Sequence, residues 1–555
     1  MSKLSAALLV IASAAFSSDD QDLPSYRDVA ADVGLTRPNR FGSPAKKLIT
    51  ETTGSGGAFL DYDADGRLDL YIVNGQTLDE ATAGEPGAPN QLYRNRGGGG
   101  FELVEGAGVG DTGWGGGAAA ADYDNDGDTD LFVTNYGANV LYRNNGDGTF
   151  TDVTESAGVA DERWSTSAAF GDVNGDGFLD LYVCNYIAFT TKLLDDLDPQ
   201  FCIWRGVPVM CGPNGLPGEV DALYFNRGDG SFEDVTERAG VRNPEGKGLG
   251  VSFVDFDGDG DEDIYVTNDS TPDFLYENDG QGNFQDVALM AGVAISMYGK
   301  PQAGMGADTG DFDGDGRPDL VVTNFQGDYN ALRRNDGMGL FTDVSDALGL
   351  TAPSFEKLGW GAKFVDVNRD GALDIFVANG HVYPEVDSAG IGESYRQTNQ
   401  VFLNLDSGRR FEDISTRVGR GLSAQHSSRG VAVGDIDDDL DLDIFINNMD
   451  EPPTLLVDTT RHENGAVRLT LVGRKTNRDG LGVVVELEVA GTKLWRSSGA
   501  VSSYLSTSDR RVTVGIGRAP RATAVTIRWP SGVMELGELP AGSDVVVVEG
   551  VGRIH

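Results

Sequence analysis

One acidic motif recurs seven times along this chain and constrains its fold more than any other feature. The motif reads D-x-[DN]-x-D-[GL]-x-x-D, and its copies begin at Asp61, Asp122, Asp172, Asp255, Asp311, Asp366 and Asp435. Successive copies start 50 to 83 residues apart. Self-similarity with a period of this size is typical of solenoids, propellers and other repeat architectures.

The segments around each motif read as β-strands. A run of small and apolar residues such as GGAFL precedes the motif, and an alternating run such as LDLYIVN follows it. A third segment of the type LYRN and a Gly-rich turn then lead into a fourth segment, F-x-D-V. Alternation bounded by Asn, Asp and Gly turns indicates strands and hairpins. Four strands per repeat is the composition of a propeller blade, so we predict an all-β, seven-bladed β-propeller over residues 24–460.

The register of the repeat predicts a closed ring. The F-x-D-V segment also occurs seven times, but its first copy, in residues 26–34, precedes the first acidic motif. The last motif is followed by a third strand at residues 454–458 and by no fourth. We therefore expect the N-terminal strand 26–34 to complete the last blade, which removes a free sheet edge.

Positions 1, 3, 5 and 9 of the seven motifs carry 26 Asp and 2 Asn, all of them oxygen ligands. A Gly at position 6 permits the sharp turn that lets these side chains converge, and such a cage of six to eight oxygens at flexible geometry suits Ca²⁺ better than Mg²⁺. An EF-hand is not expected, because its last ligand is a Glu at position 12. Solvated Asp-Gly turns would explain one or two loops but not seven, since unpaired carboxylates this close repel one another. In the seventh motif Leu440 replaces the glycine, so that loop is expected to be distorted or empty.

The predicted ligands for up to seven Ca²⁺ ions are, loop by loop, Asp61, Asp63, Asp65 and Asp69; Asp122, Asp124, Asp126 and Asp130; Asp172, Asn174, Asp176 and Asp180; Asp255, Asp257, Asp259 and Asp263; Asp311, Asp313, Asp315 and Asp319; Asp366, Asn368, Asp370 and Asp374; and Asp435, Asp437, Asp439 and Asp443.

The charge of the chain excludes several classes of partner. The formal net charge is −44, which should repel nucleic acid and anionic membranes. A disordered acidic chain would lack aromatic residues, whereas this one carries 25 Phe and 17 Tyr. No stretch approaches the ~18 apolar residues of a membrane span. We expect a monomer that recognises an extracellular protein or glycan.

The N-terminus and the cysteines point to an oxidising compartment. Lys3 is followed by an apolar run from Leu4 to Phe16, so we predict a signal peptide in residues 1–18 and a secreted or periplasmic protein. Cys202 and Cys211 lie nine residues apart and could form a disulfide there. Cys184, in the strand-like run LDLYVCN, is expected to be a buried free thiol.

Residues 461–550 lack the acidic motif but keep alternating runs such as GVVVELEVAG and AVTIRWPSG. They predict a small antiparallel β-sandwich or barrel. Its arginines could pack against the acidic ring or bind a partner, or they could simply lie on solvated strand faces.

The motif and its flanking strands resemble the FG-GAP (VCBS-type) repeats of integrin α-subunit propellers. The segments NRDGLG (477–482), VGIG (514–517) and IRWPSG (527–532) resemble the ASPIC/UnbV domain. The whole chain therefore resembles a bacterial-type member of the cartilage acidic protein family, which implies a secreted, calcium-binding protein. The resemblance extends to residues 202–219 and favours a Cys202–Cys211 bridge. The domain's usual G-A-R-V is here Gly482-Val483-Val484-Val485.

No constellation typical of an enzyme is present, so we expect a non-enzymatic scaffold. The strand ends opposite the acidic loops carry His381, His426, Arg429 and Asn379, which form a possible ligand face. A carbohydrate-binding or carbohydrate-active protein using that face is the alternative, and a purely structural surface module is a third reading. These side chains could equally satisfy loop backbone groups.

Overall fold

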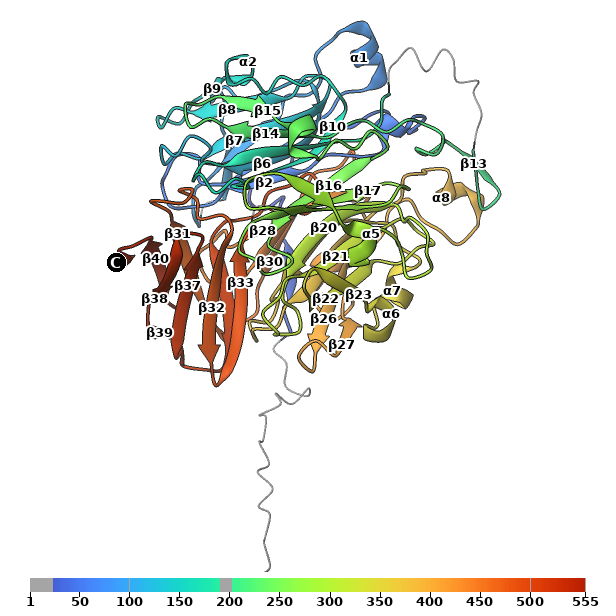
Figure 1. Ribbon diagram of the computed structural model, residues 1–555. Helices are drawn as coiled ribbons and strands as arrows, with labels where there is room; N and C mark the ends of the chain where they lie inside the picture. The colour runs from blue at the N-terminus through green and yellow to red at the C-terminus, as the bar shows by residue number, and fades with distance from the viewer. Residues whose placement is uncertain (1–22, 99, 190–201, 500, 555) are drawn as a thin grey trace, which may run out of the picture.

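The computed structural model describes residues 23–98, 100–189, 202–499 and 501–554. The predicted signal peptide, residues 1–18, lies outside them. The described chain is all-β, with strands arranged as a ring of small sheets and a C-terminal group of strands beside it, drawn in red at the lower left of Figure 1.

Most of the chain forms four-stranded antiparallel sheets of one repeated type, and the described residues contain seven of them. In chain order the first four sheets are β2 (Gly57–Leu60), β3 (Asp69–Ile72), β4 (Gln91–Asn95) and β5 (Phe101–Leu103); β6 (Trp114–Ala121), β7 (Asp130–Tyr136), β8 (Val140–Asn144) and β9 (Phe150–Asp152); β10 (Ser165–Gly171), β11 (Asp180–Asn185), β14 (Ala222–Asn226) and β15 (Phe232–Asp234); and β16 (Gly248–Val254), β17 (Asp263–Asn268), β18 (Phe274–Asn278) and β19 (Phe284–Asp286). The last three are β20 (Gly304–Gly310), β21 (Asp319–Asn324), β22 (Ala331–Gly337) and β23 (Leu340–Asp343); β24 (Gly359–Val365), β25 (Asp374–Asn379), β26 (Gln400–Leu405) and β27 (Arg410–Asp413); and β28 (Ser428–Gly434), β29 (Asp443–Asn448), β30 (Thr454–Asp458) and β1 (Tyr26–Asp28).

The seventh sheet joins the two ends of the repeat region. Strand β1 pairs antiparallel with β30, with Tyr26 opposite Asp458 and Asp28 opposite Leu456. The first strands of successive sheets contact one another in order, and β2 also contacts β28. The sheets are therefore the blades of a closed propeller, and no blade in the described ring lacks its outer strand.

Short helices follow several outer strands. The helices are α1 (Leu78–Ala83), α2 (Thr154–Ala157), α4 (Thr236–Ala239), α5 (Ala288–Ala291), α6 (Ser345–Leu348), α7 (Thr351–Ser354) and α8 (Val386–Ala389), with 3-10 turns η1 (Ile49–Glu51) and η2 (Gly421–Ser423). Helix α2 ends at Gly158 with φ +77°, a left-handed conformation that glycine adopts without strain. A hairpin of β12 (Cys202–Trp204) and β13 (Val207–Val209) projects from the third blade.

An asparagine at the end of each third strand ties neighbouring blades together. In the first blade the Asn95 side-chain amide donates to the carbonyl of Leu68 in its own blade and to that of Ile436 in the seventh. The equivalent bonds to a neighbouring blade are made by Asn144, Asn226, Asn278, Asn335 and Asn404. The seventh blade has Asp458 at this position, and a carboxylate cannot donate such a bond.

The C-terminal strands form two packed sheets. One contains β35 (Val512–Gly517), β31 (Gly465–Val472), β40 (Asp544–Val548) and β41 (Gly552–Ile554), and the other contains β33 (Thr492–Ser498), β32 (Val483–Val489), β37 (Ala524–Trp529) and β38 (Gly532–Glu535), with a small pair β36 (Arg521–Ala522) and β39 (Leu539–Pro540). Their facing side chains, Val467, Leu487 and Ile527 among them, make an apolar core of their own. Strands β31 and β40 run parallel, so the sandwich is not wholly antiparallel as alternation alone suggested.

A segment of the C-terminal domain fills the axis of the ring. Strand β34 (Val501–Ser502) pairs with β16, and the segment that follows, residues 503–509, bonds the innermost strands of other blades. These bonds are Ala307 N–H to Ser503 O, Leu505 N–H to Ser167 Oγ, Ala118 N–H to Leu505 O, Thr507 N–H to Gly57 O, and Asp509 N–H to Val433 O. The ring of Tyr504 packs on Trp360 in the sixth blade, with centroids 5.0 Å apart. Every blade therefore contacts this segment, which we call the axial segment.

Small residues on the innermost strands make room for the axial segment. A Cβ at Gly56 would overlap the carbonyl oxygen of Leu505, and one at Gly306 would overlap that of Ser503. Tyr504 and Leu505 are 0% and 1% exposed. The small-residue runs before each acidic motif therefore serve this close approach.

Candidate metal centres on the loop face

The acidic motifs connect the first and second strands of the blades, and their own side chains fix the loop conformation. In the first loop, Oδ1 and Oδ2 of Asp61 accept hydrogen bonds from the backbone N–H groups of Asp65 and Gly66, at 3.0 and 2.9 Å. Asp69 accepts from Tyr62 in the same loop and from Asn95 in the third strand. Gly66 has φ +86°, which explains the glycine at position 6.

Carboxylates of the same loop converge in at least four of the loops. Potential ligand atoms lie within 4.8 Å of one another in Asp61, Asp63 and Asp69; in Asp122, Asp124 and Asp130; in Asp255, Asp257 and Asp259; and in Asp311, Asp313 and Asp315. The Oδ1 atoms of Asp63, Asp124 and Asp313 are buried without a hydrogen-bond partner in the described chain. All three stand at position 3, so the loops present converging oxygens that fit a hard, oxygen-seeking cation such as Ca²⁺.

Burial also perturbs the acids at position 9. It raises the pKa of Asp69 and Asp319 to about 8, and that of Asp130 to about 9, with nearby carboxylates of the same loop adding to the effect. The backbone bonds that each accepts act in the opposite direction. A divalent cation at the centre of the loop would favour the charged carboxylates and relieve their repulsion.

The other loops differ in their side chains. In the third loop Asn174 Oδ1 accepts from Asp176 N–H, and in the sixth the amide of Asn368 donates to Asp370 at 3.1 Å. The seventh loop is not distorted. Leu440 adopts φ +67°, so it takes the left-handed conformation that glycine has elsewhere. This corrects the expected distortion, whereas the other expectation drawn from Leu440, an empty loop, stays a prediction.

The C-terminal domain covers part of this face. The backbone N–H of Asp122 donates to Oδ2 of Asp479 at 2.8 Å, and the Arg496 guanidinium donates to the carbonyl of Gly371 at 2.9 Å. Asn464 bonds the carbonyl of Asn368. Of the roles left open for this domain, packing against the acidic ring is therefore the one observed.

A cavity of about 550 Å³ lies between the two domains, beside the third, fourth and fifth loops. Some of its charged wall residues are paired with one another. Lys363 bonds Asp308 at 2.8 Å, and Arg511 bonds Asp509 at 2.8 Å. Asp255 and Asp257 of the fourth loop also line the cavity, and neither forms an ion pair with an Arg or Lys of the described chain.

The possible ligand face is buried. His381, Asn379 and Arg429 are 0%, 0% and 1% exposed. Arg429 stacks on Trp360 and donates to the carbonyl of Thr52, while the Asn379 amide donates to that of Thr398. These side chains therefore satisfy loop backbone groups and do not line an open surface in this structure.

His426 is the exception, since its side chain is 23% exposed, and it bonds Glu451 at 2.6 Å. It also lies in the chain beside Ser427, whose hydroxyl donates to the carbonyl of His381. The two histidine segments are thus neighbours, but only one of the two imidazoles is accessible.

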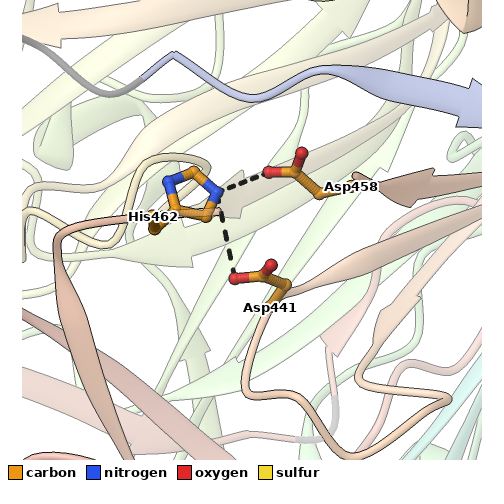
Figure 2. A group of neighbouring side chains, drawn as sticks. All are labelled: Asp441, Asp458 and His462. Carbon is orange, nitrogen blue, oxygen red and sulfur yellow. Dashed lines mark hydrogen bonds and ion pairs between the residues drawn. The ribbon is translucent and has the colours of Figure 1, made fainter. Parts of the chain in front are cut away.

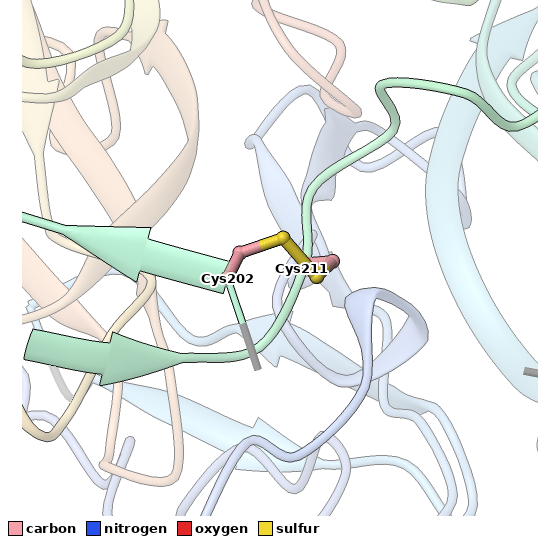
Figure 3. The surroundings of a disulfide bond; sticks show 2 residues. All are labelled: Cys202 and Cys211. Carbon is pink, nitrogen blue, oxygen red and sulfur yellow. A yellow bond between two sulfur atoms is a disulfide. The ribbon is translucent and has the colours of Figure 1, made fainter. Parts of the chain in front are cut away.

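The disulfide hairpin covers His381. Cys202 and Cys211 are bonded, as expected, and the bond fastens the base of the β12–β13 hairpin (Figure 3). Trp204 on this hairpin lies against His381, with ring centroids 6.0 Å apart, and donates to Glu393 at 2.7 Å. Cys184 is buried and free, as expected.

Burial of His381 predicts acid sensitivity. Burial, together with Arg429 and Arg205, lowers its pKa to about 3. An unfolded histidine takes up a proton near pH 6.5, whereas the folded one does not, so stability is lost as the pH falls from 6.5 towards 3, at about 1.4 kcal/mol per pH unit. Urea unfolding at pH 7 and pH 5 should show a difference that is about 2 kcal/mol smaller in His381→Gln than in the wild type. Equal pH sensitivity in the wild type and His381→Gln would contradict the assignment.

One buried cluster was missed in the sequence. Figure 2 shows His462 between Asp458 and Asp441. Its Nε2 atom lies 2.6 Å from Oδ2 of Asp458, within hydrogen-bond distance, and 3.9 Å from Oδ1 of Asp441. Arg369 of the sixth loop pairs with the same Asp441 at 2.8 Å. His462 and Arg369 both lie against these carboxylates, and the cluster joins the sixth and seventh blades where the bridging asparagine is replaced by Asp458. The only sequence signal for this cluster is that Asp458 stands where the other LYRN-type segments have their final Asn.

Comparison with known families agrees with this architecture. A family model described as FG-GAP-like repeat matches residues 61–133, 122–183, 210–266, 255–322 and 311–377, which together span more than half of the chain. The chain belongs to the FG-GAP-like repeat family. A second model, described as ASPIC and UnbV, matches residues 473–554 of this FG-GAP-like repeat protein. Both resemblances seen in the sequence are confirmed.

Curated relatives of this FG-GAP-like repeat protein include Cartilage acidic protein 1 of Homo sapiens, 26% identical over 348 residues that cover 61% of this chain and 49% of the relative. The protein of the same name from Mus musculus is 27% identical over 332 residues, covering 58% and 48%. The chain spans about half the length of these relatives.

Similar solved structures include an Agrocybe aegerita lectin described as recognising non-reducing terminal N-acetylglucosamine, with a TM-score of 0.40 and 18% identity, covering 66% of this chain and 82% of the lectin. Another is YCF48 bound to D1 peptide, with a TM-score of 0.38 and 12% identity, covering 77% and 98%. Within the described residues, no helix is both long and apolar enough to cross a membrane.

Proposed function

We propose that this chain is an exported, calcium-binding propeller that acts as a rigid interaction scaffold and not as an enzyme. The observation that carries the proposal is the set of buried, unpartnered carboxylate oxygens at position 3 of three loops, Asp63, Asp124 and Asp313. Buried polar atoms in folded proteins are almost always satisfied. Ca²⁺ at the predicted ligand sets would satisfy these oxygens and supply positive charge to a chain of net charge −44.

Each loop residue has a separate task in this proposal. Position 1, as in Asp61, holds the loop closed through two backbone N–H bonds. Position 9, as in Asp69, links the loop to its third strand through Asn95, whose amide reaches the next blade. Cation binding in one loop would therefore stiffen the joint between two blades.

The proposed location outside the cytoplasm draws on two features. The Cys202–Cys211 bond suits an oxidising compartment, where Ca²⁺ is also abundant. The apolar run from Leu4 to Phe16 has the length of a signal peptide core. We further propose domain limits of 24–460 and 461–550, in keeping with β30 ending at Asp458 and β31 starting at Gly465. The partner would be a protein or glycan, and the chain a monomer.

Two measurements test the proposal. Calorimetric titration of the chelator-treated, full-length protein with CaCl₂ should give saturable binding, with weaker binding of MgCl₂. Immobilised protein, probed with a glycan array and with soluble extracellular proteins, should retain a ligand in CaCl₂ and release it in EDTA. Absence of calcium binding would refute the metal sites, and calcium binding with no retained ligand would leave only a structural module.

A further inference from the structure

The seventh loop has the backbone of a cation-binding loop. Oδ1 and Oδ2 of Asp435 accept from the N–H groups of Asp439 and Leu440, at 3.2 and 2.9 Å. Asp443 accepts from Ile436 at 3.1 Å. These bonds repeat those of Asp61 and Asp69 in the first loop. Loop shape alone therefore does not set the seventh loop apart.

What sets it apart is the close contact of an arginine from the C-terminal domain with its first Asp, since Arg478 and Arg496 of the same domain approach Asp122 and Asp366 only to 3.7 and 3.9 Å. Arg468, on β31, is 3% exposed and places its guanidinium 2.6 Å from Oδ2 of Asp435. The same guanidinium lies 2.8 Å from Asp438 and 2.6 Å from Asp544. Burial next to three carboxylates keeps this side chain charged and fixed, because a guanidinium presents a rigid fork of donors to carboxylates.

Other cationic groups complete the neutralisation of this loop. Arg511 donates to the backbone carbonyl of Asp435 at 2.9 Å, and Arg369 pairs with Asp441 at 2.8 Å. The fourth loop is the contrast. Among the described residues, no Arg or Lys forms an ion pair with Asp255, Asp257, Asp259 or Asp263. The carboxylates of the fourth loop therefore have no cationic side chain paired with them, whereas those of the seventh loop do.

We propose that the seventh loop is the docking receptor for Arg468 of the C-terminal domain and takes no Ca²⁺. The guanidinium of Arg468 pairs with the carboxylate of Asp435. A divalent cation at the centre of the loop would lie close to this fixed positive charge and would be repelled by it. Asp437, at position 3, is exposed, whereas its counterparts Asp63, Asp124 and Asp313 have buried, unpartnered oxygens. Oδ1 of Asp443 in the seventh loop is also buried without a hydrogen-bond partner, so the guanidinium of Arg468 is what distinguishes this loop. The inference rests on the proposed calcium binding of the other loops.

The test counts calcium ions bound to the full-length protein by native mass spectrometry during a CaCl₂ titration. Asp257→Ala in the fourth loop, which removes the ligand oxygen that an Asn would keep, should lower the number of bound ions by one. The matched change Asp437→Ala in the seventh loop should leave the number unchanged. Asp437 is exposed and Asp257 is half-buried, and both side chains lie in loops outside the apolar core.

A second pair of variants tests the arginine. Arg468→Gln should raise the count by one, because the loop keeps its backbone and loses its resident charge, whereas Arg521→Gln, an exposed arginine of the same domain, should not. If Asp437→Ala lowers the wild-type count, the inference is overturned, whatever Arg468→Gln does. If the wild type binds no calcium, the proposed function fails instead, and the two failures are distinguishable.

Discussion

Chelating calcium is expected to cost this protein most of its stability. At about 1 mM free Ca²⁺ and a Kd of roughly 10⁻⁴ M, each occupied loop stabilises the folded chain by about 1.4 kcal/mol. Six such loops would contribute roughly 8 kcal/mol, which is comparable with the whole free energy of unfolding of an ordinary domain. Urea unfolding in CaCl₂ and in EDTA measures the difference directly.

The same experiment has an internal control. Asp259→Asn, at an exposed position of the fourth loop, should reduce the calcium-dependent part by about one loop's share and leave unfolding in EDTA nearly unchanged. Excess MgCl₂ should restore less stability than CaCl₂. Unfolding curves that coincide in CaCl₂ and EDTA would contradict cation binding as the source of the loops' stability.

Truncating the side chains of the axial segment is expected to lower the stability of the protein by a comparably large amount. Tyr504 and Leu505 are fully buried at the centre, and the Tyr504 hydroxyl donates to the carbonyl of Thr53 at 3.0 Å. Truncating a buried leucine or a large aromatic residue to alanine costs about 2–5 kcal/mol. The double variant Tyr504→Ala/Leu505→Ala should therefore unfold at clearly lower urea, although the two losses need not add because the residues are adjacent.

Hydrogen exchange locates that effect. The inner strands β2, β16 and β20 should lose protection from exchange in the double variant. Strands β2 and β20 hydrogen-bond the axial segment, and β16 pairs with β34, which directly precedes it. The control is Val533→Ala, a residue of the same domain that is 64% exposed and remote from the axis. Wild-type protection of the inner strands in the double variant would show that the axial segment does not support the ring.

The repeat made the propeller predictable from sequence, because each local signal agreed with the others. Asp and Gly at fixed offsets, alternating strands and the displaced F-x-D-V segment all indicated one blade, and the observed β1–β30 pairing follows that pattern. The bridging asparagines, such as Asn95, were visible only as ends of strands. Their role depends on a carbonyl in another blade, which no local pattern encodes.

The contacts between the two domains could not be predicted from the sequence either, because they also join residues from separate parts of the chain. Arg468 and Tyr504 act on residues that are far away in the chain, Asp435 and Trp360. His381 and Arg429 were placed on the correct end of their blades, but the burial imposed by the 202–211 hairpin could not be read from spacing. Leu440 misled because propensity favours glycine at φ +67°, yet the surrounding bonds hold a leucine there.

The order of synthesis gives the axial segment a further consequence. A nascent chain emerges from the ribosome N-terminus first, so the early blades exist before residues 503–509 of the 555 have been made. Strand β1 has no partner until β30 has been made, and the glycine-lined centre of the ring stays open to water until residues 503–509 have been made. The ring is therefore completed only after all seven blades have been synthesised, which favours a late, cooperative completion step over blade-by-blade maturation.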